Sequence, residues 1–383
     1  MIDTIVLVLK QNMYTVINHN KFDPSTEGLF NFAYYRLGGR SNMVCKQNPT
    51  PNELKAGIYK PRLTITKRIN KLRNFEIMLK IEFSVPKLLF GNNFDELEDS
   101  DFGKVVRILQ AKLREMGVLV YEHKLVDAPV SNIHYSKNIP LTDHSTPYTY
   151  LKNLSKANIN LRLDVNQTDF RNEGHSVKYR ANSFEVVFYD KLKDLAKAKV
   201  SEKRAEEKDN QIQLNLLDDI TFKKPFEVLR MEVRLNRKQK LIQMLGKIGF
   251  EEEPTFQALL KKDIAQKILL YYLSEIEAGF PAILRYDSEP KDFMSEFAIN
   301  NPQVGLKKAL QMFGLKVLFD TIGVREFREV TKQYGRENWY RLNKELEGFV
   351  YPQKPDSFTF LRRAVAEFKP LKMFDFMAET VNN

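Results

Sequence analysis

Cysteine and long apolar runs are nearly absent from this chain of 383 residues. Its single cysteine, Cys45, excludes an internal disulfide framework and a cysteine-based zinc cluster, and it is typical of a reducing compartment. No apolar run approaches the roughly 18 residues of a membrane span. The start carries an acid, Asp3, where a signal peptide has basic residues. We therefore expect a cytoplasmic chain with no membrane partner, in which residues 2–9 form a buried strand.

Several catalytic signatures are also missing. The five histidines are at least ten residues apart, so there is no His-x-His pair and no zincin helix. The Gly-x-x-x-x-Gly-Lys-Ser/Thr loop of NTP-driven motors is absent, and no serine lies in a nucleophile elbow.

Basic residues are in surplus. Lys and Arg number 60 against 49 Asp and Glu, which gives a formal charge of +11 and an isoelectric point near 9.3. This surplus favours a polyanionic partner, nucleic acid first. The hydrophobic fraction of 43% is enough for a large core, and the length predicts two or three structural units.

The periodicity changes along the chain. Alternation of apolar and polar residues predicts strands over 2–9, 61–67, 76–85, 118–121, 130–136, 159–168, 183–189 and 226–236. Helical patterns begin after Asp99-Ser100-Asp101 and cover 148–156, and the charged segment 190–209 is typical of a solvated helix. From about residue 251 onward the pattern is mostly helical.

We predict an α+β fold of duplicated ferredoxin-like or RRM-like antiparallel sheet units with helices on one face, followed by an all-α C-terminal domain. The expected domains are a non-catalytic α+β unit over 1–140, a catalytic α+β unit over 141–250 and a helical domain over 251–383. The duplication rests on an internal echo, because Leu79-Lys-Ile-Glu82 resembles Leu229-Arg-Met-Glu232. Each of these stretches follows a shorter strand that ends in basic residues.

The three later strands share a polar face. In each one, alternate residues are apolar, and the residues between them point the other way. If helices cover the apolar face, the opposite face presents Arg162, Asp164, Glu185, Tyr189, Arg230, Glu232 and Arg234.

This set of residues has a chemical use. Clustered carboxylates suit Mg²⁺ or Mn²⁺, and such an ion polarises a phosphodiester and lowers the pKa of a nearby phenol. The Tyr189 oxygen could then attack phosphorus and hold DNA as a phosphotyrosine, while arginines bind neighbouring phosphates. Lys191 and Lys193 could stabilise the phenolate.

Two plainer interpretations remain. A solvated sheet face with Glu–Arg pairs between strands has the same pattern and needs no catalysis. Tyr271-Tyr272 resembles a tandem nucleophile, but the apolar residues around it favour a core helix.

At these strands the sequence resembles the gene II/X-type replication initiators of filamentous phages and related plasmids. The resemblance covers about residues 1–245. It rests on the order of short motifs: Met1–Leu9, Ile81–Asn93, Leu161–Val165, Val186–Lys191 and Val228–Leu235.

The resemblance implies an origin-specific nickase that links the 5′ end of one DNA strand to a tyrosine and later re-joins the strand. Tyr189 matches the nucleophile's position, and Asp164 and Glu232 match the metal carboxylates. Glu185 is added from the face argument, so the third ligand stays open. The implied partners are Mg²⁺ or Mn²⁺, double- and single-stranded origin DNA, a host helicase and a single-strand-binding protein, in the cytoplasm of a bacterial host.

A second nucleic-acid contact is predicted in the helical region. Val324–Tyr334, Gly335 and Arg336–Leu346 have helix-turn-helix character. The basic residues that could meet phosphates are Arg325, Arg328, Lys332, Arg336, Arg341 and Lys344. Alternatively, these helices only support the catalytic part, with Phe327, Val330, Trp339 and Leu342 as core.

Two rival functions stay open. The first is a non-catalytic origin- or RNA-binding protein that uses an RRM-like sheet, although the exposed positions are charged apart from Tyr189. The second is a palm-type primase with two metal ions, in which the tyrosine would be dispensable.

Overall fold

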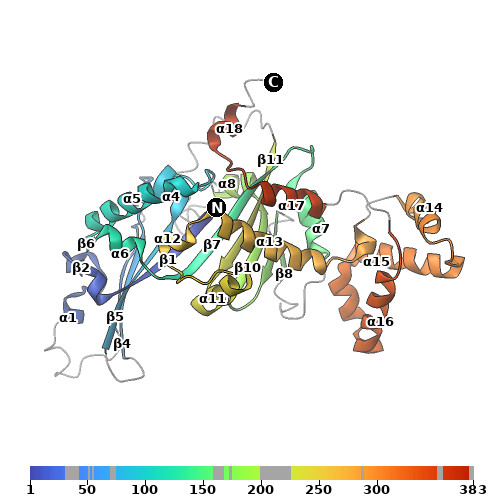
Figure 1. Cartoon of the computed structure of the whole chain (residues 1–383), viewed down its shortest axis with the longest axis horizontal. Helices are drawn as coiled ribbons and strands as arrows, with labels where there is room; N and C mark the ends of the chain where they lie inside the picture. Colours follow the sequence, from blue (N-terminus) through green and yellow to red (C-terminus); the bar gives the residue numbers. More distant parts are fainter. Residues whose placement is uncertain are drawn as a thin grey trace.

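The chain has an α+β fold built on one large antiparallel sheet, as the computed structural model shows (Figure 1). The structure describes residues 1–30, 43–50, 52–53, 56–69, 75–157, 168–171, 175–198, 226–285, 289–351 and 357–378. The sheet has nine strands in the order β3-β4-β5-β1-β7-β11-β10-β9-β8, and β2 and β6 form a separate pair.

The strands have the following bounds: β1 Ile2–Lys10, β2 Tyr14–Val16, β3 Met43–Gln47, β4 Arg62–Ile69, β5 Phe75–Ser84, β6 Val118–Val120, β7 Val130–Leu141, β8 Thr168–Arg171, β9 Ser176–Arg180, β10 Phe184–Asp190 and β11 Glu227–Leu235. Seven of the eight predicted strands are thereby confirmed, although β7 continues to Leu141. The predicted strand 159–168 falls almost entirely outside the described residues.

One face of the sheet is apolar and covered by helices. The helices that share its core are α5 Phe102–Glu115, α6 Glu122–Val126, α7 Pro147–Ser155, α11 Lys238–Lys247, α12 Phe256–Leu259, α13 Lys262–Ala278 and α17 Ser357–Glu367. The alternation of the strands explains the packing. Leu63 and Ile65 of β4 and Leu229 and Met231 of β11 are buried in this core, whereas the residues between them point to the other face.

Apart from the additional edge strand β8, the sheet consists of two four-stranded halves that are related by symmetry about the contact between β1 and β7. Reading outward from that contact, β1-β5-β4-β3 on one side mirrors β7-β11-β10-β9 on the other. The sequence echo joins β5 to β11 in this correspondence. We call β1, β3, β4 and β5 the first half of the sheet, and β7, β9, β10 and β11 the second half.

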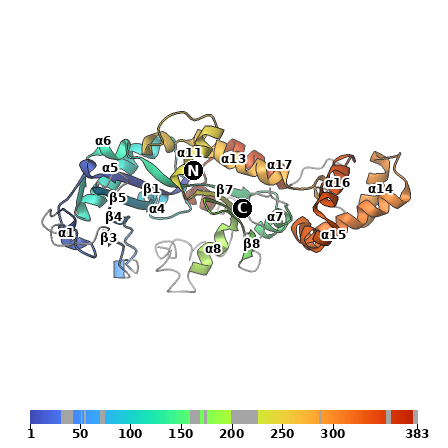
Figure 2. The same cartoon turned by 90° about the horizontal axis from the view of Figure 1, so that it is seen from below.

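The second half carries a small apolar cover on its polar face. Phe94 packs there with Val228 of β11, with Leu371, and with Leu192 and Leu195 of α8 (Lys191–Ala198). Figure 2 shows α8 on the side of the sheet opposite α11 and α13. The described part of the predicted solvated helix is therefore amphipathic, and its apolar side closes over the sheet.

The remaining helices are α1 Glu27–Phe30, α4 Val85–Phe90, α14 Pro290–Asn300, α15 Leu306–Val330, α16 Arg336–Glu347 and α18 Met373–Ala378. The short 3₁₀ helices are η1 Gln11–Met13, η2 His19–Lys21, η3 Asp99–Asp101, η6 Ala282–Leu284 and η7 Lys332–Tyr334. α14, α15 and α16 project beyond the α7 end of the sheet, and α17 returns to it (Figures 1 and 2). None of the helices in the described part of the chain combines the length and the low charge that a bilayer crossing needs.

A candidate metal and nucleophile site on the polar face of the sheet

Four neighbouring strands place polar side chains together on the face opposite the helices. Asp3 lies on β1, His134 on β7, Glu232 on β11 and Tyr189 on β10. The register places Glu232 opposite Ser136 and Val187, while Tyr189 lies two positions along the same face, opposite Arg230. The predicted grouping of Glu185, Tyr189, Arg230, Glu232 and Arg234 on one face agrees with this register.

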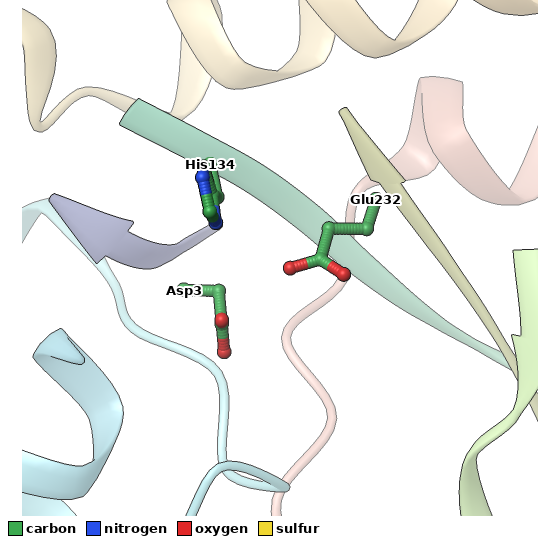
Figure 3. A group of neighbouring side chains, drawn as sticks. All are labelled: Asp3, His134 and Glu232. Atoms are coloured by element: carbon green, nitrogen blue, oxygen red, sulfur yellow. The ribbon is translucent and has the colours of Figure 1, made fainter. Parts of the chain in front are cut away.

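Asp3, His134 and Glu232 form a compact triad. One potential ligand atom from each side chain lies within 4.8 Å of the other two (Figure 3). The triad and Tyr189 line the same open pocket, which has a volume of about 410 Å³. Two carboxylates and an imidazole are a donor set that fits a divalent ion, and the imidazole favours Mn²⁺ over Mg²⁺.

Asp3 reaches this face because of an irregularity in β1. The register with β7 shifts between Ile2 and Ile5, and both of these isoleucines are buried on the helix side. Asp3 and Thr4 between them both line the pocket. Strict alternation would send one of them into the core, so the bulge is what exposes both.

Arg230 holds Asp3 in place. One terminal nitrogen donates to Oδ1 of Asp3 over 2.7 Å and to Oγ of Ser136, and the other donates to Asn138 and to the carbonyl of Asn93. Burial opposes ionisation of Asp3, but the nearby Arg230 outweighs it and holds the pKa of this carboxyl well below its usual range. Arg230 is 2% exposed, so its placement favours a positioning role over the phosphate contact predicted from the sequence.

His134 is oriented by Asn236. Its Nε2 lies 3.2 Å from Oδ1 of Asn236, an acceptor, so Nε2 carries the proton and the other ring nitrogen keeps its lone pair. Burial lowers the pKa of His134, which favours the neutral form that binds metal ions. Arg234 donates to Oε2 of Glu232 over 2.7 Å, so each carboxylate of the triad keeps one oxygen that no arginine binds.

Tyr189 and Lys191 lie side by side at the end of β10. The Nζ of Lys191 is 6.0 Å from the centre of the Tyr189 ring and donates to Oδ1 of Asn93. Burial, with a contribution from Arg230, lowers the pKa of Lys191 to about 7. Burial raises the pKa of Tyr189 well above its usual value, so the phenol needs a cation or a base before it can react.

The loop 91–98 completes the site, and its Gly91-Asn92-Asn93 turn carries the contacts to Lys191 and Arg230. Glu96 anchors the loop where β7 extends beyond the start of β1. Its carboxylate accepts from the backbone N–H groups of Asn138 and Leu371, and it forms a buried ion pair with Lys137. Burial opposes ionisation, but Lys137 and the other donors lower the pKa of Glu96.

Other predicted site residues lie apart from the triad. Glu185 contacts Lys178, Arg180 and Arg234 instead of the candidate ligands. Lys193 is at the surface, 3.3 Å from Nδ1 of His175. Arg162 and Asp164 lie outside the described residues.

Two helices joined by a short turn occupy the segment of the predicted helix-turn-helix. α15 ends at Val330, Gly335 has a φ of 91° that suits glycine, and α16 follows at once. Phe327 packs 6.4 Å from Trp339, and Arg328 lies over the Trp339 ring at 5.1 Å. Arg325 is half-buried, and Lys332 pairs with Glu329 over 3.4 Å. Arg336 begins α16, with its backbone alone described.

The alternative tyrosines take structural positions. Tyr272 is buried, and Tyr271 packs against it on α13, as expected for a core helix. Tyr135 and Tyr179 are also buried, and their hydroxyls donate to backbone carbonyls of Leu259 and Leu154.

Sequence reasoning missed Asp3 and His134. Buried Ile133 and Tyr135 on either side place His134 on the polar face, so the alternation of β7 did contain a signal. The signal for Asp3 was hidden by the bulge. Comparisons with models of known protein families, with curated proteins and with solved structures found no match to this chain.

Proposed function

We propose that this protein is a rolling-circle replication initiator, a metal-dependent enzyme that nicks and re-joins one strand of origin DNA through a phosphotyrosine. The observation that carries the proposal is the meeting of Tyr189 with Asp3, His134 and Glu232 in one open pocket. Two acids, an imidazole and a phenol that line one pocket are a combination typical of catalytic sites.

Each residue has a defined part in the proposed reaction. Asp3, His134 and Glu232 would hold Mn²⁺ or Mg²⁺, which would supply a positive charge for the phosphodiester oxygens. The Tyr189 oxygen bonds to phosphorus as the bond from phosphorus to the 3′ oxygen breaks. The departing 3′ oxygen takes up a proton from solvent, which leaves a 5′-phosphotyrosine and a free 3′-OH primer, and the reverse reaction re-joins the strand.

The phenolic proton needs an acceptor. Lys191 is next to the ring, and a pKa lowered to about 7 lets its neutral amine take the proton near neutral pH. Arg234 lines the pocket whereas Arg230 is buried, so of these two arginines Arg234 is the one that can approach a phosphate.

The first experiment removes the phenolic oxygen. We expect Tyr189→Phe to abolish both nicking of a supercoiled plasmid carrying the replicon's own origin and the covalent adduct on the 5′ end. The matched control is Tyr59→Phe, because Tyr59 lines the same pocket but its hydroxyl accepts from the backbone N–H of Ser84. An adduct that persists in Tyr189→Phe and disappears in Tyr59→Phe would show that Tyr59, and not Tyr189, is the nucleophile.

A second experiment separates the triad from the ligands predicted earlier. Asp3→Asn and His134→Ala should remove the Mn²⁺ dependence of cleavage together with the activity. Glu185→Gln should keep both, because Glu185 is held by basic residues outside the triad. If Glu185→Gln loses the activity and the two triad variants keep it, Glu185 and Asp164 are the metal ligands instead of the triad.

Duplex origin recognition is the second part of the proposal. The turn between α15 and α16 carries Lys332, Arg336 begins α16, and this connectivity is that of a DNA-reading motif. A host helicase and a single-strand-binding protein are the partners that the released strand would need. Template-directed incorporation of NTPs would instead indicate a primase.

A further inference from the structure

The candidate pocket is not confined to the second half of the sheet. It continues across β1 to β5 and β4, where Tyr59, Lys60, Arg62, Glu82 and Lys87 line it. The first half therefore forms one wall of the pocket that contains Tyr189, although it contributes only Asp3 to the triad.

The polar face of the first half is a continuous surface. The register aligns Lys46, Thr64, Lys80 and Val8 in one row across β3, β4, β5 and β1. All four side chains are exposed or half-buried, whereas Leu63 and Leu79 on the opposite side are fully buried beneath the helices. The row crosses three strand spacings, which is about 14 Å.

This surface is basic. Its charged side chains comprise five cations and two acids, namely Lys10, Lys46, Arg62, Arg68, Lys80, Glu76 and Glu82. Lys80 and Glu82 form an ion pair over 3.8 Å, in a part of the face where both are well exposed. Thr66 and Met78 lie between the cations and add a hydroxyl and an apolar contact.

The second half offers less to a ligand. The apolar cover of Phe94 and α8 lies on its polar face, and Glu185 contacts three of its basic side chains. Among the described residues, exposed basic side chains thus predominate on the polar face of the first half, whereas α8 lies over part of the second half (Figure 2).

We propose that the polar face of the first half binds single-stranded DNA next to the phosphate that Tyr189 attacks, which rests on the proposed function. Lysine and arginine side chains spaced along a groove bind successive phosphates, and apolar side chains between them contact bases with little sequence preference. A pocket of about 410 Å³ has the size of a small-molecule site, so the strand that enters it is unpaired there. The first half is a guide for the strand, and the second half cuts it.

The test measures binding without cleavage. A fluorescent DNA oligonucleotide of about ten nucleotides, a length in the range of single-strand-binding folds, is titrated with the full chain in EDTA at several salt concentrations. Each phosphate contact with single-stranded DNA contributes about 0.7 to the slope of log affinity against log salt. The double variant Arg62→Ala/Lys80→Ala should therefore reduce that slope by about 1.4.

Two controls give the result its meaning. Lys104→Ala/Arg107→Ala removes the same charge from the exposed side of α5, on the far side of the sheet, and should leave the slope unchanged. Arg62→Lys/Lys80→Arg keeps the charges and should restore the wild-type slope, which excludes misfolding as the cause.

Equal slopes for the two double-alanine variants overturn the inference. A loss that appears only with duplex DNA, or only with RNA of the same sequence, overturns it as well. These outcomes are distinct from a failure of the proposed function, which shows as absence of the covalent adduct in the wild-type protein whatever the slopes are.

Discussion

The two halves of the sheet share a backbone frame but differ in what they place on it. Glu82 of β5 pairs with Arg62 and Val6, and Glu232 of β11 pairs with Val187 and Ser136. These glutamates are the equivalent positions of the internal echo. One carboxylate is thus present in both halves, at the same place in the same arrangement of strands.

The neighbours of that carboxylate differ. Two residues earlier, Lys80 pairs with Thr64, whereas Arg230 pairs with Tyr189. Two residues later, Ser84 pairs with Thr4, whereas Arg234 pairs with His134. Threonine therefore takes the places of both the phenol and the imidazole, so the first half has neither the candidate nucleophile nor a nitrogen ligand.

The halves also differ in cover. Glu82 is half-exposed, while Glu232 is 2% exposed near the loop 91–98 and α8. Burial strengthens electrostatic interactions and makes an unpaired charge costly, so the second half needs its fixed network of arginines and amides. The comparison shows that the neighbours and the burial of a carboxylate determine its chemistry, even at equivalent positions of the two halves.

The sharpest way to break the comparison is to change the equivalent glutamates. Under the proposed function, Glu232→Gln should lower the rate of metal-dependent nicking by at least about a hundredfold, because a ligand and the partner of Arg234 are lost. Glu82→Gln should still form the covalent adduct and bind the single strand more tightly, because it removes a negative charge from a basic face. Nicking rates and oligonucleotide anisotropy measure the two effects. Similar losses of nicking rate in both variants would mean that the two halves do not have separate roles in cleavage and strand binding.

The cover of the second half is tested at Glu96. Glu96→Ala leaves Lys137 as an uncompensated buried charge, which should cost about 3 kcal/mol. The loss should be local: amide hydrogen exchange should accelerate in β7 and β11 and stay unchanged in β4 and β5. Uniform acceleration across the sheet would show that the loop 91–98 supports the whole fold.

A pH titration refines the same point. The folded pKa of Glu96 is below its unfolded value of about 4.3, because Lys137 and the hydrogen-bond donors outweigh burial. Its stabilisation is therefore complete above the unfolded pKa and is lost as the pH falls through the folded pKa. The difference in urea midpoint between wild type and Glu96→Gln should be large at pH 7 and shrink towards pH 3. A difference in urea midpoint that stays constant with pH would show that the stabilisation does not depend on the charge of Glu96.

The smallest effect is expected far from the sheet. Lys332→Ala should weaken binding of duplex origin DNA only a few-fold and lower the salt slope by about 1, the contribution of one phosphate contact. The matched control is Lys291→Ala, at an exposed position of α14, which should change neither quantity. If both variants behave like wild type in a duplex-binding titration, the helical extension is a support.

The sequence allowed much of the fold to be predicted, because the relevant signals are local. Alternation in β4, β5, β10 and β11 sets both the strand and the face of each side chain. Glu232, Tyr189 and their shared face were accessible in this way. β3, at one edge of the sheet, and β9, next to the edge strand β8, were not predicted, since neither stands out by an apolar run of its own.

The rest of the site depends on contacts between distant segments. Asp3 reaches the polar face through a bulge in β1, and the pairing of β1 with β7 brings it to His134. The alternation of apolar and polar residues within one strand does not indicate which other strand it pairs with. Likewise, the burial of Arg230 follows from a loop more than a hundred residues earlier, which is why a residue expected to meet phosphate instead orients Asp3.

The span of the triad has a consequence during synthesis. Asp3 leaves the ribosome long before Glu232, because more than two hundred residues separate them. Closing so long a loop is slow and comes late in folding. A growing chain thus lacks its complete set of ligands until β11 has joined the sheet, and under the proposed function an unfinished molecule would leave the host's DNA intact.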